Sequence, residues 1–180
     1  MAMDHKLAAI KLLALDVDGV LTDGSINISS NGELFKAFNA KDGMGISCAL
    51  RSGIQIAIVT GRKSQIIHNR AQELGITLLR EGVKDKFGEL QSLSEKLDLS
   101  PRQVAYMGDD LNDLPAFRAA GTAFAPADAV GEVKAAADFV TTAGGGHGAV
   151  REAIERILRA QGVWETIVAS YFQSGQGDRQ

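Results

Sequence analysis

Short, fully apolar runs alternate along the chain with segments in which apolar residues recur at helical spacing. The apolar runs predict buried strands at residues 12–15, 55–59, 76–79, 104–107 and 122–125. The intervening segments predict helices at residues 43–51, 64–74, 84–97, 111–119 and 129–136, and a last one at 149–160. Strands that are apolar throughout are typical of a parallel sheet covered by helices on both faces. The predicted fold class is therefore α/β, with a doubly wound parallel sheet.

One segment interrupts this alternation. Residues 25–38 contain two alternating apolar and polar runs around Ser30, Asn31 and Gly32, which predicts a β-hairpin. The hairpin directly follows the first strand, where a doubly wound fold carries a helix. An insertion at the carboxyl end of that strand would overhang the active site of such a fold.

The chain of 180 residues fits one domain, which we place at residues 1–161. The glycine-rich segment 143–148 predicts a flexible hinge before the last helix. Residues 162–180 form a C-terminal tail with aromatic side chains, and its last seven residues predict disorder.

Composition narrows the classes of partner. The formal net charge of −3 predicts no basic surface for nucleic acid or acidic lipid. A single cysteine, Cys48, excludes an intrachain disulfide and fits a reducing compartment. The N-terminus lacks the apolar stretch of a signal peptide, and no apolar run approaches the roughly 20 residues that span a bilayer. We therefore expect a cytoplasmic protein without nucleic-acid or membrane partners.

Two carboxylates follow the first predicted strand. Asp16 and Asp18 come directly after the apolar run, and Gly19 permits the turn that ends it. Buried carboxylates without partners are costly, so this pair needs a cation or hydrogen-bond donors. The structural alternative is a pair of aspartates that cap a tight turn.

Two further positions suit an anion. Thr60 follows the second strand, where its hydroxyl can donate to a phosphoryl oxygen or can instead cap the next helix. Lys86 begins a helix, where a cation opposes the helix dipole and suggests a compensating anion. A solvated lysine is the alternative reading of Lys86, as it is for its neighbour Lys84.

The fourth strand ends in an acidic run, Gly108–Asp109–Asp110–Leu111–Asn112–Asp113. Capping of the next helix needs fewer carboxylates than this. Together with the two carboxylates after the first strand, the carboxylates of this run supply the hard oxygen ligands that Mg²⁺ prefers. The combination predicts phosphoryl transfer, with Asp16 as nucleophile, Asp18 as general acid and base, and Thr60 and Lys86 stabilising the transferring phosphoryl group.

These residues resemble the four motifs of the haloacid dehalogenase superfamily, which are Asp16-x-Asp18, Thr60, Lys86 and Gly108–Asp109–Asp110. Within it, the chain resembles the family of 3-deoxy-D-manno-octulosonate 8-phosphate (KDO 8-phosphate) phosphatases in the segments LDVDGVLTDGSI, NGELFKAFNAKDGMGI, TGRKSQI, GVKDK, GDDLNDLPAF and GGGHGAVREAIERIL. Members of this family lack a separate cap domain, and the short intervals between the motifs here leave no room for one. The resemblance implies hydrolysis of KDO 8-phosphate through an aspartyl-phosphate intermediate.

The resemblance also implies which residues bind the metal ion and the substrate. Mg²⁺ would be held by Asp16, the backbone carbonyl of Asp18, and Asp109, with Asp110 or Asp113 orienting its water ligands. Besides Asp18 and Lys86, substrate contacts carry over to Asn39, Lys41, Asp42, Gly43, Ser47, Gly61, Arg62 and Arg70. The two arginines suit a carboxylate and a phosphate, although arginines solvated on a helix surface are the alternative. The chain departs from the family at Lys41 and His147, where arginine is common.

Finally, the resemblance implies a homotetramer in which the hairpins form a barrel between subunits and a neighbour's C-terminal tail lies near the active site. One alternative substrate is a sialic-acid-like 9-phosphate. A more remote alternative is a phospho-accepting or regulatory module without catalysis. Receiver domains of that class carry their acceptor aspartate after the third strand and lack a general acid two residues later.

Overall fold

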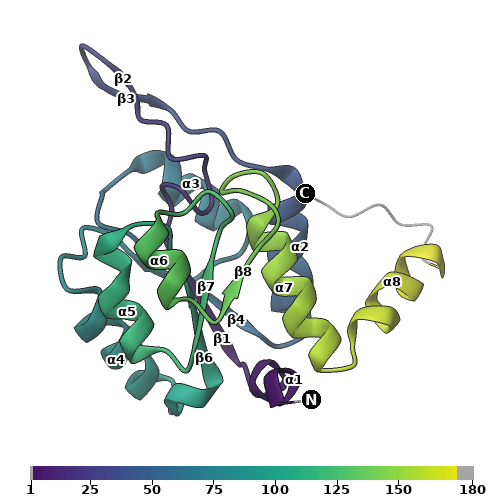
Figure 1. Ribbon diagram of the computed structural model, residues 1–180. Coiled ribbons are helices and arrows are strands. Elements are labelled where there is room, and N and C mark those ends of the chain that lie inside the picture. Colours follow the sequence, from purple (N-terminus) through teal and green to yellow (C-terminus); the bar gives the residue numbers. More distant parts are fainter. Residues whose placement is uncertain (1, 174–180) are drawn as a thin grey trace.

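A computed structural model of the chain describes residues 2–173, with side chains from His5 onward (Figure 1). The strands are β1 (Leu12–Leu15), β2 (Asn27–Ser29), β3 (Gly32–Phe35), β4 (Gln55–Val59), β5 (Leu78–Arg80), β6 (Val104–Met107), β7 (Thr122–Ala125) and β8 (Phe139–Val140). The helices are α1 (Ala2–Ala8), α2 (Ala40–Arg51), α3 (Gln65–Glu73), α4 (Lys86–Lys96), α5 (Leu114–Ala119), α6 (Gly131–Ala136), α7 (Ala149–Ala160) and α8 (Trp164–Gln173). Short 3₁₀ turns lie at Pro101–Gln103 and Leu111–Asp113.

Six of the strands form one parallel sheet in the order β5-β4-β1-β6-β7-β8. Strand β1 is central, and its last residue, Leu15, pairs with Ile58 of β4 and with Met107 of β6. The carboxyl ends of these three strands therefore lie side by side, and the residues that follow them meet at one edge of the sheet. The predicted doubly wound α/β fold is confirmed.

Both faces of the sheet are covered by helices (Figure 1). Along β1, Leu13 and Leu15 join a buried cluster with residues of α1, α2, α3 and α7. Leu12 and Ala14 point the other way, into a cluster with residues of α4, α5 and α6. This burial on both sides explains why β1 is apolar at every position. Among the described residues, no helix combines the length and apolar character needed to cross a bilayer.

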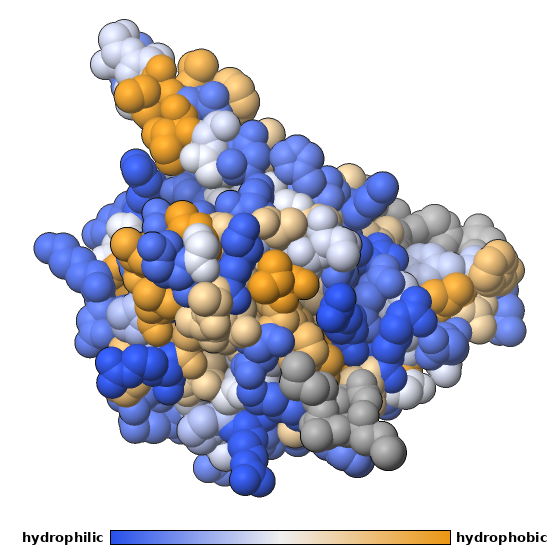
Figure 2. Space-filling model, in the orientation of Figure 1, coloured by the Kyte–Doolittle hydropathy of each residue, from blue (hydrophilic) through white to orange (hydrophobic). Residues whose placement is uncertain are grey.

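The hairpin predicted at residues 25–38 is confirmed as the antiparallel pair β2–β3, with Ser29 opposite Gly32. It projects from the carboxyl edge of the sheet (Figure 1). Its apolar side chains are exposed, Ile28 to 71% and Leu34 to 60%. Figure 2 shows this apolar surface as a patch on the projection.

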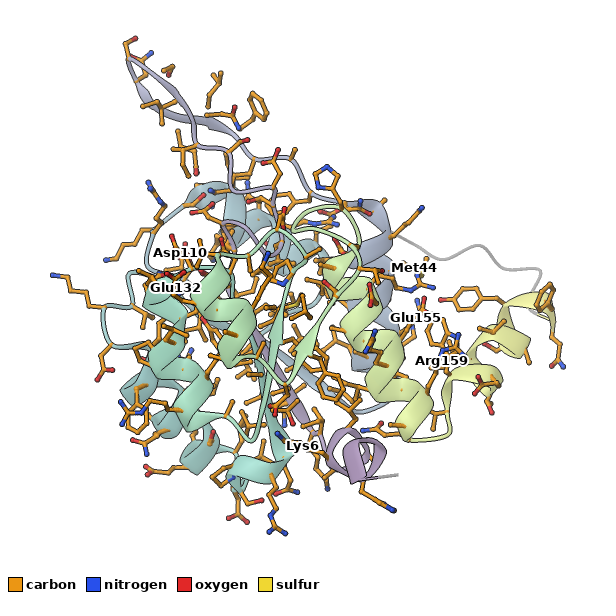
Figure 3. All side chains as sticks on the ribbon, viewed as in Figure 1. Lys6, Met44, Asp110, Glu132, Glu155 and Arg159 are labelled. Atoms are coloured by element: carbon orange, nitrogen blue, oxygen red, sulfur yellow. The ribbon has the colours of Figure 1, made fainter. Side chains whose placement is uncertain are left out.

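One strand, β8, and two helices, α1 and α8, were not predicted. Strand β8 has two residues, too few for a periodic pattern. Helix α8 forms the first part of the predicted tail, and its first residue, Trp164, is buried and lies 5.0 Å from the Arg151 guanidinium and 5.4 Å from that of Arg159. In Figure 3, Glu155 and Arg159 are seen on the part of α7 nearest to α8. The last seven residues of the tail, for which disorder was predicted, lie outside the described residues.

The glycine-rich segment 143–148 packs against the turn that follows β1. The backbone N–H of Gly146 donates to the Val20 carbonyl at 3.0 Å. A Cβ atom on Gly145 would lie 1.9 Å from the Gly19 carbonyl oxygen, so only glycine allows this approach. The prediction of a flexible hinge is wrong, because these glycines serve close backbone packing.

The buried hydroxyl of Thr122 in β7 has no hydrogen-bond partner within the described part of the chain. An unsatisfied buried polar group costs about 1–3 kcal/mol, so we expect Thr122→Val to raise the free energy of unfolding by about 1 kcal/mol. Urea denaturation measures this change. The matched control is Thr141→Val, because the buried Thr141 hydroxyl donates to the Ala143 carbonyl at 2.7 Å. That variant should be destabilised, and a Thr122→Val protein no more stable than the parent would contradict the prediction.

Candidate active site

The carboxylates that follow β1 and β6 meet at the carboxyl edge of the sheet. Oxygen atoms of Asp16, Asp109 and Asp113 all lie within 4.8 Å of one another. Asp16 and Asp113 are buried, and Asp109 is half-buried. The strand order produces this cluster, because β1 and β6 are neighbours in the sheet although they are far apart in the sequence.

Lys86 enters this cluster from the first turn of α4. Its Nζ atom lies 2.9 Å from Asp16 Oδ2 and 2.6 Å from Asp113 Oδ1, and its side chain is 3% exposed. Burial opposes the positive charge, but the two carboxylates outweigh it and raise the pKa of Lys86 above its usual value. The position of Lys86 at the start of a helix suggested a compensating anion, and that anion is a pair of carboxylates. The alternative interpretation, a solvated lysine, is wrong.

Asp113 is the organising carboxylate of the cluster. Its Oδ1 atom accepts hydrogen bonds from Lys86 Nζ at 2.6 Å and from the Tyr106 hydroxyl at 2.7 Å. Its Oδ2 atom accepts from the backbone N–H groups of Asp109 at 3.0 Å and Asp110 at 3.3 Å. These four bonds occupy both oxygens, so Asp113 orients its neighbours. Burial and then the Asp113 charge raise the pKa of Tyr106 well above its usual value, which keeps the hydroxyl a donor.

The remaining carboxylates fit a divalent cation. Burial, followed by repulsion from Asp113, raises the pKa of Asp16 to about 6 and that of Asp109 to about 7. Within residues 5–173, the Asp109 carboxylate accepts no hydrogen bond and forms no ion pair. It lies against the turn after β1, where a Cβ atom on Gly19 would be 2.0 Å from Asp109 Oδ2. One lysine does not balance three clustered carboxylates, and Mg²⁺ prefers such oxygen ligands.

Asp110 takes no part in this cluster. It is exposed, and its Oδ1 atom accepts from the Leu111 N–H at 2.7 Å at the start of a 3₁₀ turn. Of the two residues predicted to orient metal-bound water, the structure brings Asp113 to the cluster and leaves Asp110 capping a turn.

Asp18 points to different partners from those of Asp16. Its Oδ1 atom accepts from Lys36 Nζ at 2.5 Å, and its Oδ2 atom lies 3.3 Å from Arg62 Nε. Lys36 follows β3 of the hairpin and also pairs with Glu33 at 3.2 Å. Neither Lys36 nor Glu33 was identified from the sequence. The sequence signal that could have identified them was their position, because both are charged residues at the hairpin that was predicted to overhang the site.

Thr60 directly follows β4, the strand next to β1, and is buried. Its hydroxyl oxygen accepts from the Arg62 N–H at 3.4 Å and so shapes the loop that carries Gly61 and Arg62. The cap of α3 is Ser64, whose side chain accepts from the Ile67 N–H. The alternative reading of Thr60 as a helix cap is therefore wrong.

A cavity of about 480 Å³ opens between the hairpin base, α2 and α3. Three residues predicted to contact substrate, Gly43, Ser47 and Arg70, are among those that line it. Arg70 lies over the Phe38 ring at 5.6 Å and pairs with Glu73 at 2.8 Å, so it is not a freely solvated arginine. Lys36 also lines the cavity and thereby links it to Asp18.

Three further residues predicted to contact substrate, Asn39, Lys41 and Asp42, do not line this cavity. Asn39 caps α2 by accepting from the Lys41 N–H at 2.8 Å, and the Lys41 side chain is exposed. The Asp42 carboxylate is 2% exposed and accepts from the N–H groups of Gly148 and Arg151 at 3.2 and 2.7 Å. Because it caps the start of α7, we assign Asp42 to helix packing instead of substrate binding.

Comparison with known proteins gives a consistent picture. Residues 78–154 match the model of haloacid dehalogenase-like hydrolases. The chain is 50% identical to the 3-deoxy-D-manno-octulosonate 8-phosphate phosphatase KdsC of Escherichia coli K12 over 87% of its own length and 84% of the relative's. It is 44% identical to the corresponding protein of Haemophilus influenzae, over 97% and 94% of the two chains.

Solved structures agree with these sequence matches. The structure resembles that of the 3-deoxy-D-manno-octulosonate 8-phosphate phosphatase from Moraxella catarrhalis, which was determined in complex with a magnesium ion, a phosphate ion and a KDO molecule. The TM-score is 0.91 at 42% identity, and the match covers 94% of this chain and 98% of the other.

The raised pKa values predict how Mg²⁺ stabilises the protein at different pH. Both aspartates have folded-state pKa values above the ordinary 3.8, so their contribution to stability is present at low pH and is lost as pH rises through about 6 for Asp16 and about 7 for Asp109. Mg²⁺ binds the ionised carboxylates. We therefore expect saturating Mg²⁺ to raise the melting temperature by about 2 °C or more at about pH 8, and by much less at about pH 5.

Thermal melts with and without Mg²⁺ across this range provide the measurement. The Asp109→Asn variant should lose the Mg²⁺-dependent rise in melting temperature. The Asp98→Asn variant should keep it, because Asp98 is exposed and distant from the cluster. An increment that is equal at both ends of the pH range would rule out this linkage.

Proposed function

The chain belongs to the family of 3-deoxy-D-manno-octulosonate 8-phosphate phosphatases, and we propose that it hydrolyses KDO 8-phosphate to KDO and inorganic phosphate. The observation that carries this function is the buried cluster at the end of β1, where Lys86 lies 2.9 Å from Asp16 beside two further carboxylates. Asp16, Asp109 and the backbone carbonyl of Asp18 hold Mg²⁺, and Asp113 orients the site. The bound ion offsets the repulsion between these carboxylates and the phosphate dianion.

In the first step, an oxygen of Asp16 attacks the phosphorus atom in line with the sugar oxygen. A bond forms between Asp16 and phosphorus as the bond from phosphorus to the sugar oxygen breaks. The leaving oxygen takes a proton from the Asp18 carboxyl group, and KDO departs. Lys86 and the Thr60 hydroxyl stabilise the charge on the transferring phosphoryl group.

In the second step, Asp18 acts as a base. Its carboxylate takes a proton from a water molecule as the water oxygen attacks the phosphorus of phospho-Asp16. The bond between Asp16 and phosphorus breaks, which releases inorganic phosphate and restores the Asp16 carboxylate. Asp18 ends the cycle protonated, ready for the next leaving group.

In this proposal, the sugar acid binds between the cluster and the cavity, whose volume is about 480 Å³. We assign its contacts to Arg62, Arg70 and the polar groups of Asn39, Lys41, Gly43, Ser47 and Gly61. The Arg62 side chain is 61% exposed beside Asp18, and so it is free to turn toward an anionic substrate. The protein works in the cytoplasm in this proposal, where the reducing environment fits its free, buried Cys48.

Phosphate release from a panel of substrates tests the activity. The panel contains KDO 8-phosphate, a sialic acid 9-phosphate and simple sugar phosphates, each with Mg²⁺. We expect KDO 8-phosphate to be preferred, and Asp16→Asn to lower its turnover by at least about a thousandfold because the nucleophile is lost. The exposed Asp98→Asn is the charge-matched control and should retain activity.

The other outcomes discriminate between the alternatives. Preference for the 9-phosphate would move the assignment to that substrate. A stable phosphoprotein without turnover would support the phospho-accepting module. Activity that survives in Asp16→Asn would rule out Asp16 as the nucleophile.

We further propose that the protein is a homotetramer joined through its hairpins, with a neighbour's C-terminal tail near each active site. The exposed apolar side chains of the hairpin, Ile26, Ile28, Leu34 and Phe35, support this assembly. Phe172, near the end of α8, is 88% exposed and offers an apolar group for a neighbouring subunit.

The double variant Ile28→Asp, Leu34→Asp tests this assembly, because buried charges would disrupt a hairpin interface. Analytical ultracentrifugation should show a tetramer for the parent protein and smaller particles for the variant. Val140→Asp, which changes an exposed apolar residue on β8, should remain tetrameric. A monomeric parent protein would contradict the proposal.

A further inference from the structure

The ammonium group of Lys36 is buried between two carboxylates that belong to different parts of the molecule. Its Nζ atom lies 2.5 Å from Asp18 Oδ1 and 3.2 Å from Glu33 Oε1, and the side chain is 3% exposed. Burying a lysine is costly unless its charge is compensated, and here both partners are acidic. The mechanism above makes no use of this cation.

The hairpin fixes the position of Lys36. Glu33 on β3 accepts a hydrogen bond from the Ser64 hydroxyl, and the Ser64 N–H donates to Glu81 at 2.9 Å. Burial would raise the pKa of Glu33, but the hydrogen bonds from Ser64 and Lys36 outweigh it, so the pKa lies below its usual value. Glu33 thus remains an anion, and it ties Lys36 to the start of α3.

The two cations at Asp18 differ in how firmly they are held. Arg62 approaches Oδ2 at 3.3 Å with a side chain that is 61% exposed and bound to no other carboxylate within residues 5–173. Lys36 approaches Oδ1 from a buried position with a second ionic contact. Lys36 is therefore the contact that can fix the rotation of the Asp18 carboxyl group, while Arg62 is able to leave it.

We propose that Lys36 is a positioning residue, which holds the Asp18 carboxyl group in the orientation needed for proton transfer to the leaving oxygen. The inference rests on the proposed function, because it assumes that Asp18 is the acid and base of the reaction. Misplacing a reacting group by about 1 Å can cost roughly a hundredfold in rate. The hairpin would then complete the acid–base site as well as carry the apolar surface.

Lys36 also lines the cavity next to Asp18, so a direct contact with the substrate carboxylate is the competing role. The two roles differ in what they depend on. Positioning of the acid matters most for a poor leaving group, which needs the proton, and little for an activated one. A carboxylate contact matters only for substrates that carry a carboxylate.

The experiment compares Lys36→Met with the parent enzyme on phosphate monoesters without a carboxylate, from p-nitrophenyl phosphate to alkyl phosphates. The value of kcat/KM reports only the steps up to formation of phospho-Asp16. We expect it to fall less than about threefold for p-nitrophenyl phosphate and about thirtyfold or more for the alkyl esters. On KDO 8-phosphate, kcat should fall while KM stays within about threefold.

Three further variants complete the test. Lys36→Arg should recover part of the loss because it keeps the charge, and the exposed Lys96→Met should behave like the parent. Glu33→Gln keeps the contact between Lys36 and Asp18 but loosens its anchor, so we expect a smaller change of the same kind. This variant gives the readout if Lys36→Met does not fold.

Two results would overturn the proposal. An equal loss for all leaving groups would mean that Lys36 does not act through the acid. A loss confined to KDO 8-phosphate with a raised KM would assign Lys36 to substrate binding. A wrong substrate assignment would be recognised separately, because the parent enzyme would then show no preference for KDO 8-phosphate.

Discussion

The rest of the site depends on one buried interaction, the contact of Lys86 with Asp16 and Asp113 at the carboxyl edge of the sheet. A buried ion pair adds little to stability, because desolvation offsets much of the attraction. This one joins the end of β1, the start of α4 and the loop after β6. It holds Asp16, the proposed nucleophile, against a cation, and the charge still unbalanced at Asp109 is what the proposed divalent metal ion would compensate.

Asp16 and Asp18 are two residues apart, but they belong to separate networks. Asp16 contacts the core through Lys86, whereas Asp18 contacts Lys36 of the hairpin and Arg62 of the loop after β4. The separation suits the different roles proposed for Asp16 and Asp18. A nucleophile needs a fixed place beside the metal ion, and an acid–base group needs to face the leaving group and then water.

The sequence was sufficient for the parts of the site that follow from strand ends. Asp16 and Thr60 come directly after a buried strand and Asp109 comes two residues after one, and a parallel sheet places such residues at one edge. Asp42 was misassigned because a carboxylate that caps a distant helix looks the same in sequence as one that binds a ligand. Gly145 was misread because flexibility and close packing both select glycine.

Lys36 could not be found from periodicity because its role depends on where the hairpin folds back. Residues 33–36 combine exposed apolar side chains, Leu34 and Phe35, with the charged pair that reaches Asp18. The apolar side chains and the charged pair are thus separated by only one or two residues of the chain. In the proposed assembly, contacts on the hairpin would restrict the motion of Lys36, which would couple the proposed interface to the orientation of Asp18.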